Sequence, residues 1–383
     1  MFTMTQNSAA QGKRALIIGA GTAGMASAIT LSRIGIEIDI IDINPNWGAL
    51  GAGLTITGPT LRALKQLGVY DEVTDQAYVG DGIQVCDPQG NPLRILPTPM
   101  LEGADTAGSG GIMRPTMHSI MHKHVEDAGV KMRLGLTADA FEQDDDSVTV
   151  TFSDGTTDRY DFVLGSDGVL SKTRQLLFPD APKAEYTGQS CWRLFLKRPE
   201  SVERRTYFLG GPVKVGFTPV SKDHMYMFLL ERCPQRWQEP EDNYKTLKQL
   251  LEGYDGILAE IRESLTEKDN PHINFRPLEC FDLPGPWYVG KVLLIGDSAH
   301  PTTPQLASGA GMGIEDALVL AEIFQKESNV EKAFSEFMHR RENRCRLVVQ
   351  SSMEIGRLEQ QRAPVEQQTA VVEKALNILK EAI

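Results

Sequence analysis

The sequence predicts an α/β protein with a parallel sheet, an antiparallel β-sheet inserted as a second domain, and a helical C-terminal tail. Three observations predict it. A strand, a glycine-rich turn, a helix and a second strand follow one another near the N-terminus, and two later apolar strands end in Gly/Asp turns at 165–168 and 296–297. Residues 183–230 instead alternate between apolar and polar side chains. Short apolar strands are typical of parallel sheets, whereas alternation is typical of antiparallel ones.

Length and charge limit the class of protein. The chain has 383 residues, 41% of them hydrophobic and 23% charged, which predicts a globular protein with two or three domains. Its net charge is −12 and no basic block occurs, so we expect neither nucleic acid nor an anionic membrane surface as a partner. No apolar run approaches the roughly 20 residues of an integral membrane segment.

The cysteines and the N-terminus indicate a cytoplasmic protein. Five cysteines are scattered along the chain without a C-x-x-C pair, which is typical of a reduced protein with neither a disulfide framework nor a zinc site. Residues 1–12 are polar and lack the pattern of a signal peptide, so we expect them to be disordered.

The first motif is a βαβ unit. An apolar strand at Arg14–Ile18 runs into Gly19-Ala20-Gly21-Thr22-Ala23-Gly24, a helix continues over Met25–Ile34, and a second strand at Ile36–Ile41 ends at Asp42. This is the G-x-G-x-x-G arrangement of a Rossmann-like dinucleotide site, with an acid about 20 residues further on. The alternative is a glycine-rich turn in another α/β fold.

Each part of this motif has a physical reason. Gly19 permits the tight turn, Gly21 lets a pyrophosphate approach the backbone, and Gly24 lets helix and strand pack closely. Asp42 can accept hydrogen bonds from a ribose.

A second strand-to-helix segment lies at 292–316. The apolar strand Val292–Ile295 breaks at Gly296-Asp297, a loop with Pro301 and Pro304 follows, and a helix is predicted from about Ala310 through Phe324. The free amides and the positive dipole end of such a helix stabilise negative charge on a ligand.

The helix predicted over Thr116–Ala128 carries His118 and His122 one turn apart, which is metal-ligand spacing. No third ligand is placed nearby and the H-E-x-x-H glutamate is absent, so we predict a solvated helix face and no metal site.

Three blocks of sequence together resemble one family. They are GAGTAG with Asp42, GSDGVLSKTR from Gly165 to Arg174, and GDSAHPTTPQLASGAGMGIEDA from Gly296 to Ala317. In order and spacing they resemble the group A flavoprotein monooxygenases, the FAD-dependent aromatic hydroxylases of the para-hydroxybenzoate hydroxylase type, over nearly the whole chain. YTGQSCWR, from Tyr186 to Arg193, is most similar to alkylquinolone, pyridine and urate hydroxylases.

The resemblance implies a Rossmann-like FAD-binding fold of the GR2 type, divided along the chain. We expect an FAD-binding domain, a substrate-binding β-sheet domain and C-terminal helices. Their predicted ranges are 13–76, 104–180 and 272–328 for the first, 77–103 and 181–271 for the second, and 329–383 for the third.

The resemblance also implies which residues contact FAD. Arg114 would lie near the pyrophosphate or ribityl chain, Asp167 would serve both FAD and NAD(P)H, and Asp297 would contact the ribityl or pyrophosphate. Ala307 stands where relatives usually have a glycine, which predicts a shift of the backbone donors near the flavin. The full set is Gly19, Gly21, Thr22, Ala23, Gly24, Asp42, Gly53, Arg114, Asp167, Asp297, Pro304, Gly309, Ala310, Gly311 and Met312.

The implied reaction is hydroxylation of an electron-rich aromatic or N-heteroaromatic ring of the hydroxypyridine, quinolone or phenol type, with or without decarboxylation. NADH or NADPH reduces the flavin, and O₂ then forms a flavin C4a-hydroperoxide that attacks the ring. A flavoprotein epoxidase or an FAD-dependent reductase of the same fold is the alternative. We expect a role in aromatic catabolism, and a monomer or homodimer.

Candidate catalytic residues lie on the predicted antiparallel sheet and the proline loop. They are His224, Tyr226, Trp192, Arg193 and Pro304. His224 and Tyr226 alternate onto one face of a strand, and either can carry a proton. The alternatives are a His224 satisfied by the neighbouring turn, which is the favoured interpretation of that residue, and a Trp192 packed in the core.

Two other classes of protein stay open. Gly-Asp-Ser at 296–298 with His300 is similar to the start of a serine hydrolase block, although its place beside a dinucleotide motif fits that chemistry poorly. A flavin-binding redox regulator without turnover is the other class.

Overall fold

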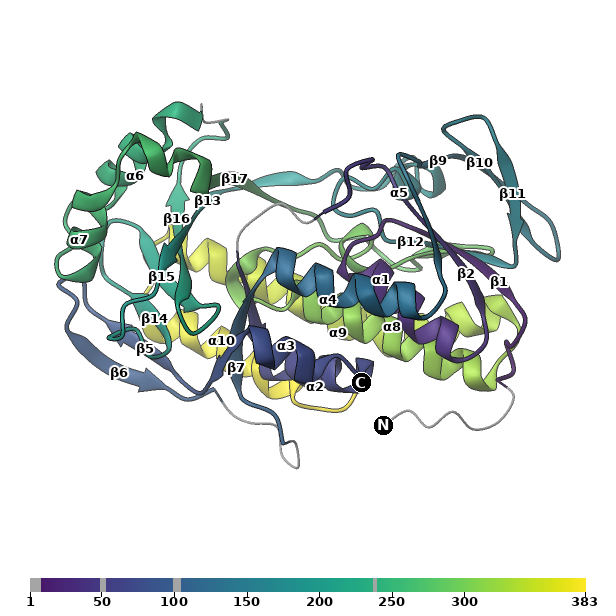
Figure 1. Ribbon diagram of the computed structural model, residues 1–383, viewed down its shortest axis with the longest axis horizontal. Helices are drawn as coiled ribbons and strands as arrows, with labels where there is room; N and C mark the ends of the chain where they lie inside the picture. Colours follow the sequence, from purple (N-terminus) through teal and green to yellow (C-terminus); the bar gives the residue numbers. More distant parts are fainter. Residues whose placement is uncertain (1–7, 49–52, 99–104, 237–239) are drawn as a thin grey trace.

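The computed structural model describes residues 8–48, 53–98, 105–236 and 240–383. It confirms the predicted α/β fold with an inserted antiparallel sheet and a helical C-terminal region. Figure 1 shows the two large sheets at opposite ends of the molecule, with the helices α8 (Gly309–Lys326) and α9 (Val330–Gln360) along its long axis.

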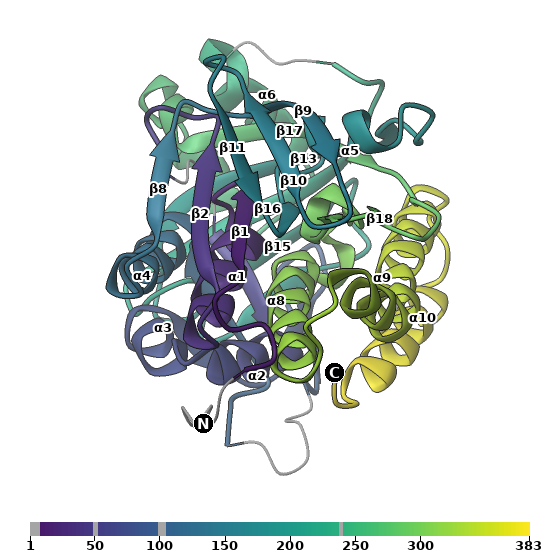
Figure 2. The same cartoon turned by 90° about the vertical axis from the view of Figure 1, so that its right-hand side faces the viewer.

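The first large sheet has six strands. Its neighbours pair in parallel, except that the edge strand β18 runs antiparallel to β19. Figure 2 shows β8, β2 and β1 side by side, near the helices α1 (Thr22–Arg33) and α8. The spatial order is β18 (Tyr288–Val289), β19 (Val292–Leu294), β12 (Phe162–Gly165), β1 (Arg14–Ile18), β2 (Glu37–Asp42) and β8 (Lys131–Leu134).

The register of this sheet brings three turns together. Ile18 at the end of β1 pairs with Gly165 at the end of β12, and Gly165 pairs with Leu294 at the end of β19. The turns that follow these strands therefore meet at one edge of the sheet, where open α/β sheets bind ligands.

The second large sheet has seven strands, all antiparallel to their neighbours except the parallel pair β14 and β5. One face packs on α6 (Asn243–Leu250) and α7 (Ile257–Ser264), through a core that includes Trp192, Phe217 and Met227. Because side chains alternate along a strand, the neighbours of these core residues point from the opposite face of the sheet, toward the nucleotide-binding half. The order is β17 (Ile273–Cys280), β13 (Glu185–Lys197), β16 (His224–Arg232), β15 (Lys214–Pro219), β14 (Arg205–Phe208), β5 (Ile83–Cys86) and β6 (Pro92–Leu96).

A three-stranded sheet joins the two halves. It contains β3 (Gly53–Thr57), β7 (Ser109–Met113) and β4 (Tyr78–Gly80). Gly111 of β7 lies so close to β15 that an added Cβ would be 2.3 Å from the Pro219 carbonyl oxygen, so only glycine permits this contact. A second such sheet contains β9 (Ala138–Gln143), β10 (Val148–Phe152) and β11 (Thr157–Tyr160).

The remaining helices differ in part from the prediction. The helix predicted over Thr116–Ala128 begins two residues earlier, as α4 (Arg114–Asp127). α6 and α7 are separate helices, because Gly253 and Gly256 between them have φ angles of 86° and 58°. Of residues 1–12, which we expected to be disordered, 1–7 lie outside the described residues, while Ala9 N donates to Gln325 O and Ala10 is buried. The other helices are α2 (Gly58–Leu67), α3 (Tyr70–Gln76), α5 (Lys172–Leu177) and α10 (Val365–Leu379).

A buried ion network fastens α9 to α8 and to the turn after β19. Arg341 of α9 is fully buried and donates to Asp316 Oδ1 and Glu315 Oε2, both at 2.8 Å. The other oxygen of Asp316 accepts from Gly296 N at 2.9 Å and bonds His300 Nε2 at 2.7 Å. Burial opposes ionisation of His300, but Cys345 and Asp316 outweigh it and hold the pKa of this histidine well above its ordinary value.

Within the described part of the chain, no helix is both long enough and apolar enough to cross a membrane.

Arg341→Leu is expected to lower the free energy of unfolding by about 3–5 kcal/mol, because it removes a fully buried cation that donates to two buried carboxylates. Glu315 then keeps only Arg344, and Asp316 keeps only His300, as a charged side-chain hydrogen-bond partner among the described residues.

Arg357→Leu, on the same helix, breaks an exposed pair with Glu354 and is expected to cost less than about 1 kcal/mol. Thermal and urea unfolding of the FAD-loaded variants measures both. Equal losses in the two variants would contradict the structural role of the buried network.

Candidate functional site

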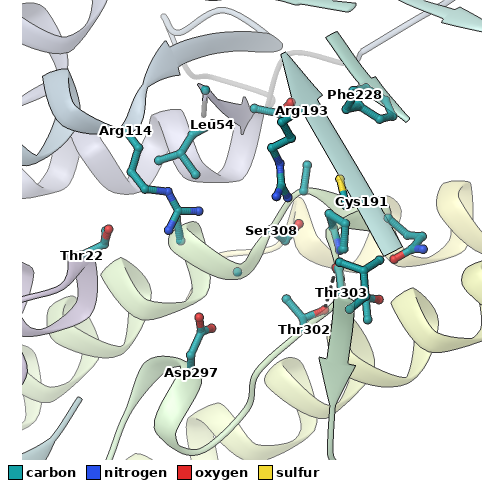
Figure 3. A pocket seen from close by; sticks show the side chains of 18 of the residues that line it. Thr22, Leu54, Arg114, Cys191, Arg193, Phe228, Asp297, Thr302, Thr303 and Ser308 are labelled. Atoms are coloured by element: carbon teal, nitrogen blue, oxygen red, sulfur yellow. Dashed lines mark hydrogen bonds between the residues drawn. The ribbon is translucent and has the colours of Figure 1, made fainter. Parts of the chain in front are cut away.

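One cavity of about 470 Å³ extends from the turn after β1 to the seven-stranded sheet. Its lining comes from the three strand-end turns, the start of α4, the loop before α8, and one face of the antiparallel sheet. A cavity of this size is typical of small-molecule and cofactor sites. Figure 3 shows side chains from these segments pointing into a common space.

Two helix N-termini open onto the cavity. Gly21 is the N-cap of α1 and Ser308 is the N-cap of α8; neither helix end has a side-chain cap or an acid in its first turn. The free amides and dipole ends of α1 and α8 favour negative charge in the space between them.

The three glycines of the first motif have different surroundings. A Cβ at Gly21 would meet nothing within 4 Å, and this residue lines the cavity, so the backbone is open to a ligand. A Cβ at Gly19 would lie 2.4 Å from Ser166 O, and one at Gly24 would lie 2.0 Å from Gly19 O. Gly19 and Gly24 therefore serve packing, while Thr22 and Ala23 join Gly21 in the lining.

Arg114 and Asp297 put opposite charges into this part of the cavity. Arg114 begins α4, and in Figure 3 its guanidinium points into the space that Arg193 also approaches. Burial, together with Arg193, lowers the pKa of Arg114. The side chain of Asp297 lines the cavity and is exposed to the space inside it. Burial of this carboxyl within the surrounding protein disfavours its charged form and raises its pKa.

The loop before α8 forms the floor between the two halves. Pro304 begins a 3-10 turn, Pro304–Leu306, and Ala307 follows it. The Ala307 N–H donates to Pro304 O at 3.0 Å. Ala307 has φ 52° and ψ 35°, the left-handed conformation that favours glycine. Alanine thus keeps a glycine-type turn at this position, at a cost of about 1–2 kcal/mol.

The glycine-rich start of α8 is only partly directed at the cavity. Gly309 and Ala310 line it. A Cβ at Gly311 would lie 2.3 Å from Thr60 Oγ1, so Gly311 permits contact with α2. Met312 is buried, its N–H donates to Ser308 O, and its carbonyl oxygen accepts from Arg341.

The antiparallel sheet supplies a wall of rings and cations. β13 and β16 contribute Arg193, Tyr226 and Phe228, and β14 and β15 contribute further residues of the same face. The Tyr226 hydroxyl is hydrogen-bonded to Thr55 Oγ1 at 2.7 Å, which ties the wall to β3, and the ring packs against Gly53. The members of this wall are Cys191, Arg193, Arg205, Tyr207, Lys214, Tyr226, Phe228 and Leu230.

Lys214 is held by a carboxylate from α9. Its Nζ donates to Glu359 Oε1 at 2.6 Å, and the Glu359 side chain is almost completely buried. Burial alone would lower the pKa of Lys214, but Glu359 and Tyr207 outweigh it and raise this pKa. Gln305, which lines the cavity, also donates to Glu359 at 3.3 Å.

Trp192 and His224, predicted as catalytic candidates, do not reach the cavity. Trp192 lies on the opposite face of β13, fully buried, with Nε1 donating to Glu231 Oε2 at 2.8 Å. His224 is exposed at the start of β16 and stacks on Phe195 with ring centroids 4.8 Å apart. Adjacent residues on a strand point to opposite faces, so Arg193 is turned inward while Trp192 packs in the core.

Asp42 and Asp167 also lie outside the lining. Asp42 accepts from the backbone N–H groups of Ala20 and Asn44, which fixes its own turn. Asp167 accepts from Ser171 Oγ and Ser298 Oγ, and its other oxygen from Thr173 N and Oγ1. Both carboxylates hold strand-end turns in place, and contacts from either to FAD or NAD(P)H stay predictions.

Ser298 and His300 do not form a nucleophile and base. Ser298 is fully buried and bonds Asp167 and Gly168 N, whereas His300 bonds Asp316. The hydrolase alternative therefore has no Ser–His pair. His300, Asp316 and Cys345 lie within metal-ligand reach of one another, but Arg341 already occupies the Asp316 carboxylate.

His118 and His122 pack on one ring. Trp47 lies 5.7 Å from the His118 ring and 4.7 Å from the His122 ring, measured between centroids. Burial, with the Arg114 charge, lowers the pKa of His118 to about 4, so the imidazole that lines the cavity is neutral at pH 7.

Several lining residues were missed from the sequence. Arg205 and Tyr207 lie at i and i+2 on β14, and Lys214 begins β15. Their alternation places them on one face, but only the pairing of the strands shows that this face meets the cavity.

Residues 13–354 match the protein family described as FAD binding domain. The chain is 31% identical over 348 residues to a putative FAD-dependent monooxygenase, YetM, of Bacillus subtilis, covering 90% of this chain and 93% of YetM. It is 29% identical to 2-heptyl-3-hydroxy-4(1H)-quinolone synthase of Pseudomonas aeruginosa, covering 91% and 90% of the two chains.

A similar fold occurs in Klebsiella pneumoniae HpxO, whose structure contains FAD and uric acid. The TM-score is 0.83 at 22% identity, with 97% of this chain and 94% of the HpxO chain covered. The uncapped ends of α1 and α8, the open backbone at Gly21 and the cation Arg114 fit the two phosphates of FAD. The chain belongs to the FAD binding domain family and is an FAD-dependent monooxygenase of the group A flavoprotein hydroxylase type.

Proposed function

We propose that this protein uses NAD(P)H and O₂ to hydroxylate an electron-rich aromatic or N-heteroaromatic ring of the hydroxypyridine, quinolone or phenol type. The supporting observation is the continuity of the cavity, which joins the anion-binding turns to a chamber walled by Tyr207, Tyr226 and Phe228. Aromatic walls suit a flat ring substrate. A quinolone synthase among the relatives is consistent with such a ring.

Bound FAD supplies hydride acceptance and oxygen activation. The α8 N-terminus, the turn at Ala307 and Arg193 offer positive potential beside the proline loop. We infer that Gly21 and Arg114 hold the phosphates and Asp297 a hydroxyl of the cofactor chain. We infer that a ring bound between the loop before α8 and the antiparallel sheet is covered on two sides, which reduces its contact with bulk water and so limits side reactions.

Tyr226 is the proposed proton-carrying group. Its side chain is buried, and its hydroxyl belongs to a chain that continues through Thr55 Oγ1 to Thr218 Oγ1, with separations of 2.7 and 3.2 Å. The Tyr226 hydroxyl acts as a relay: it accepts the proton that an aromatic hydroxyl or amino group of the substrate releases while it passes its own proton to Thr55 Oγ1. Thr55 lines the cavity, so water in the cavity is the final acceptor. Pro304 acts by shaping the floor and not by chemistry of its own side chain.

An epoxidase and an FAD-dependent reductase remain the alternative activities of the same fold. Oxygen uptake distinguishes the reductase from the epoxidase and the ring hydroxylase. The structure of the product, an epoxide or a hydroxylated ring, then distinguishes these two.

Asp297→Ala is expected to weaken FAD binding by about 10- to 100-fold, the effect of losing a hydrogen bond to a charged group. Titration of the apo-protein with FAD, followed by flavin fluorescence, measures the dissociation constant. Asp282→Ala is the matched control, because Asp282 is exposed and pairs with Arg346 outside the cavity. Unchanged FAD affinity in Asp297→Ala would remove this residue from the cofactor site.

Tyr226→Phe is expected to lower kcat by about 100-fold or more, as for loss of a general acid–base group. KM should change little, because the phenyl ring keeps its place in the wall. Tyr186→Phe is the control, since the Tyr186 hydroxyl donates to Cys233 O and does not line the cavity. A Tyr226→Phe enzyme with wild-type kcat would exclude the proton-carrying role.

A panel of hydroxypyridines, quinolones and hydroxybenzoates tests the proposed reaction. At least one ring compound should stimulate NAD(P)H oxidation and O₂ uptake and return as a hydroxylated product. The proposal fails if none does so with FAD-loaded protein.

A further inference from the structure

The substrate half of the cavity carries unbalanced positive charge, although the chain as a whole has a net charge of −12. Among the described residues that line the cavity, Arg114, Arg193, Arg205 and Lys214 carry positive charge, and Asp297 carries the one carboxylate. Arg114 faces the proposed phosphate region, and Lys214 is neutralised from behind by Glu359. Arg193 and Arg205 are the cations left over.

Arg205 is the more deeply enclosed of these two. It is 7% exposed, and its partners are neutral: Nη1 donates to Ser109 Oγ at 3.0 Å and Nη2 to the Tyr207 hydroxyl. Its buried Nε has no hydrogen-bond partner, and among the described residues no carboxylate lies within ion-pair distance of this guanidinium. A buried cation without a counter-charge is costly, so the site is built for a ligand that supplies one.

The ring wall lies between the two arginines. Arg193 is on β13 and Arg205 on β14, three strands across the sheet, or roughly 14 Å between strand axes at about 4.8 Å per strand. β16, between them, presents Tyr226 and Phe228 to the cavity. A flat ring on these side chains can therefore direct an acidic substituent toward Arg205.

Tyr207 completes this end of the chamber. The Arg205 guanidinium carbon lies 5.5 Å and the Lys214 Nζ lies 5.3 Å from the centre of the Tyr207 ring. Gly216 on the neighbouring strand has no side chain, and a Cβ there would lie 2.5 Å from Phe228 and 2.8 Å from Tyr207. The glycine makes room for the two rings beside the cations.

We propose that the ring substrate carries an anionic group, a carboxylate or its equivalent, which binds at Arg205 and the Tyr207 hydroxyl while the ring lies against Tyr226 and Phe228. This inference rests on the proposed ring hydroxylation and names the class of ring: an acid and not a neutral alkylated ring. A planar guanidinium binds a carboxylate through paired N–H donors, which a neutral substituent does not match.

The test compares matched acids and amides. Hydroxybenzoates and hydroxypyridine carboxylates are titrated into FAD-loaded wild-type protein against their carboxamides, with dissociation constants from calorimetry and from the flavin absorbance change. An acid is expected to bind about 10- to 100-fold more tightly than its amide. Amides that bind as tightly as the acids would overturn the proposal, and this comparison needs no variant.

Variants locate the effect. Arg205→Gln is expected to weaken acid binding by about 10- to 100-fold and to change amide binding less than about 3-fold, and Arg205→Lys to fall between. Arg94→Gln, an exposed arginine on β6 of the same sheet, removes the same charge away from the cavity and should change neither constant. Equal losses for acid and amide in Arg205→Gln would show that Arg205 shapes the pocket only.

Two results separate this inference from the proposed function. If a neutral ring is hydroxylated efficiently and Arg205→Gln leaves that rate unchanged, the hydroxylase assignment stands and the acidic-substrate inference fails. If acids bind through Arg205 but no ring compound is hydroxylated, the binding inference stands and the proposed reaction fails.

Discussion

The buried carboxylate of Asp316 is the contact on which the site depends. One oxygen receives Arg341 from α9, and the other receives Gly296 N and His300. The turn that carries Asp297 is thereby fixed to α8 and α9 at once. Because paired buried charges tolerate little displacement, the network holds the cavity floor in one geometry. The packing of α8 and α9 thereby determines where a bound cofactor would lie.

The same long helix connects the two halves of the cavity. α9 begins beside the six-stranded sheet and reaches the antiparallel sheet, where Glu359 holds Lys214. Its 31 residues span roughly 46 Å at 1.5 Å per residue. α9 therefore fixes the position of the substrate wall relative to the turns of the cofactor region. This explains how segments distant in sequence form one continuous cavity.

Local motifs made the nucleotide-binding half predictable. The glycine-rich turn of 19–24 and the acidic turns after β12 and β19 follow strands whose apolar runs are unambiguous, and parallel pairing brings their ends together. The functions of individual acids were harder to assign, since Asp167 uses both oxygens on Ser171, Ser298 and Thr173.

The substrate wall depended on long-range pairing. Alternation correctly placed Tyr226 and His224 on one face, but it does not give depth along the strand, and His224 lies beyond the cavity. Alternation likewise placed Trp192 and Arg193 on opposite faces of the strand, without showing which face packs in the core and which lines the cavity. The face became identifiable only from the core against α6 and α7, which takes Trp192, Phe217 and Met227.

Reaction of the FAD-loaded protein with NAD(P)H, a ring substrate and oxygen-18 gas tests the central claim most directly. Mass spectrometry of the product, alongside NAD(P)H consumption, gives both the source of the new oxygen and the stoichiometry. Ring monooxygenation predicts one labelled oxygen atom in the product for each NAD(P)H oxidised. A reduced product without label, or hydrogen peroxide as the sole fate of O₂ with every ring tested, would contradict the account.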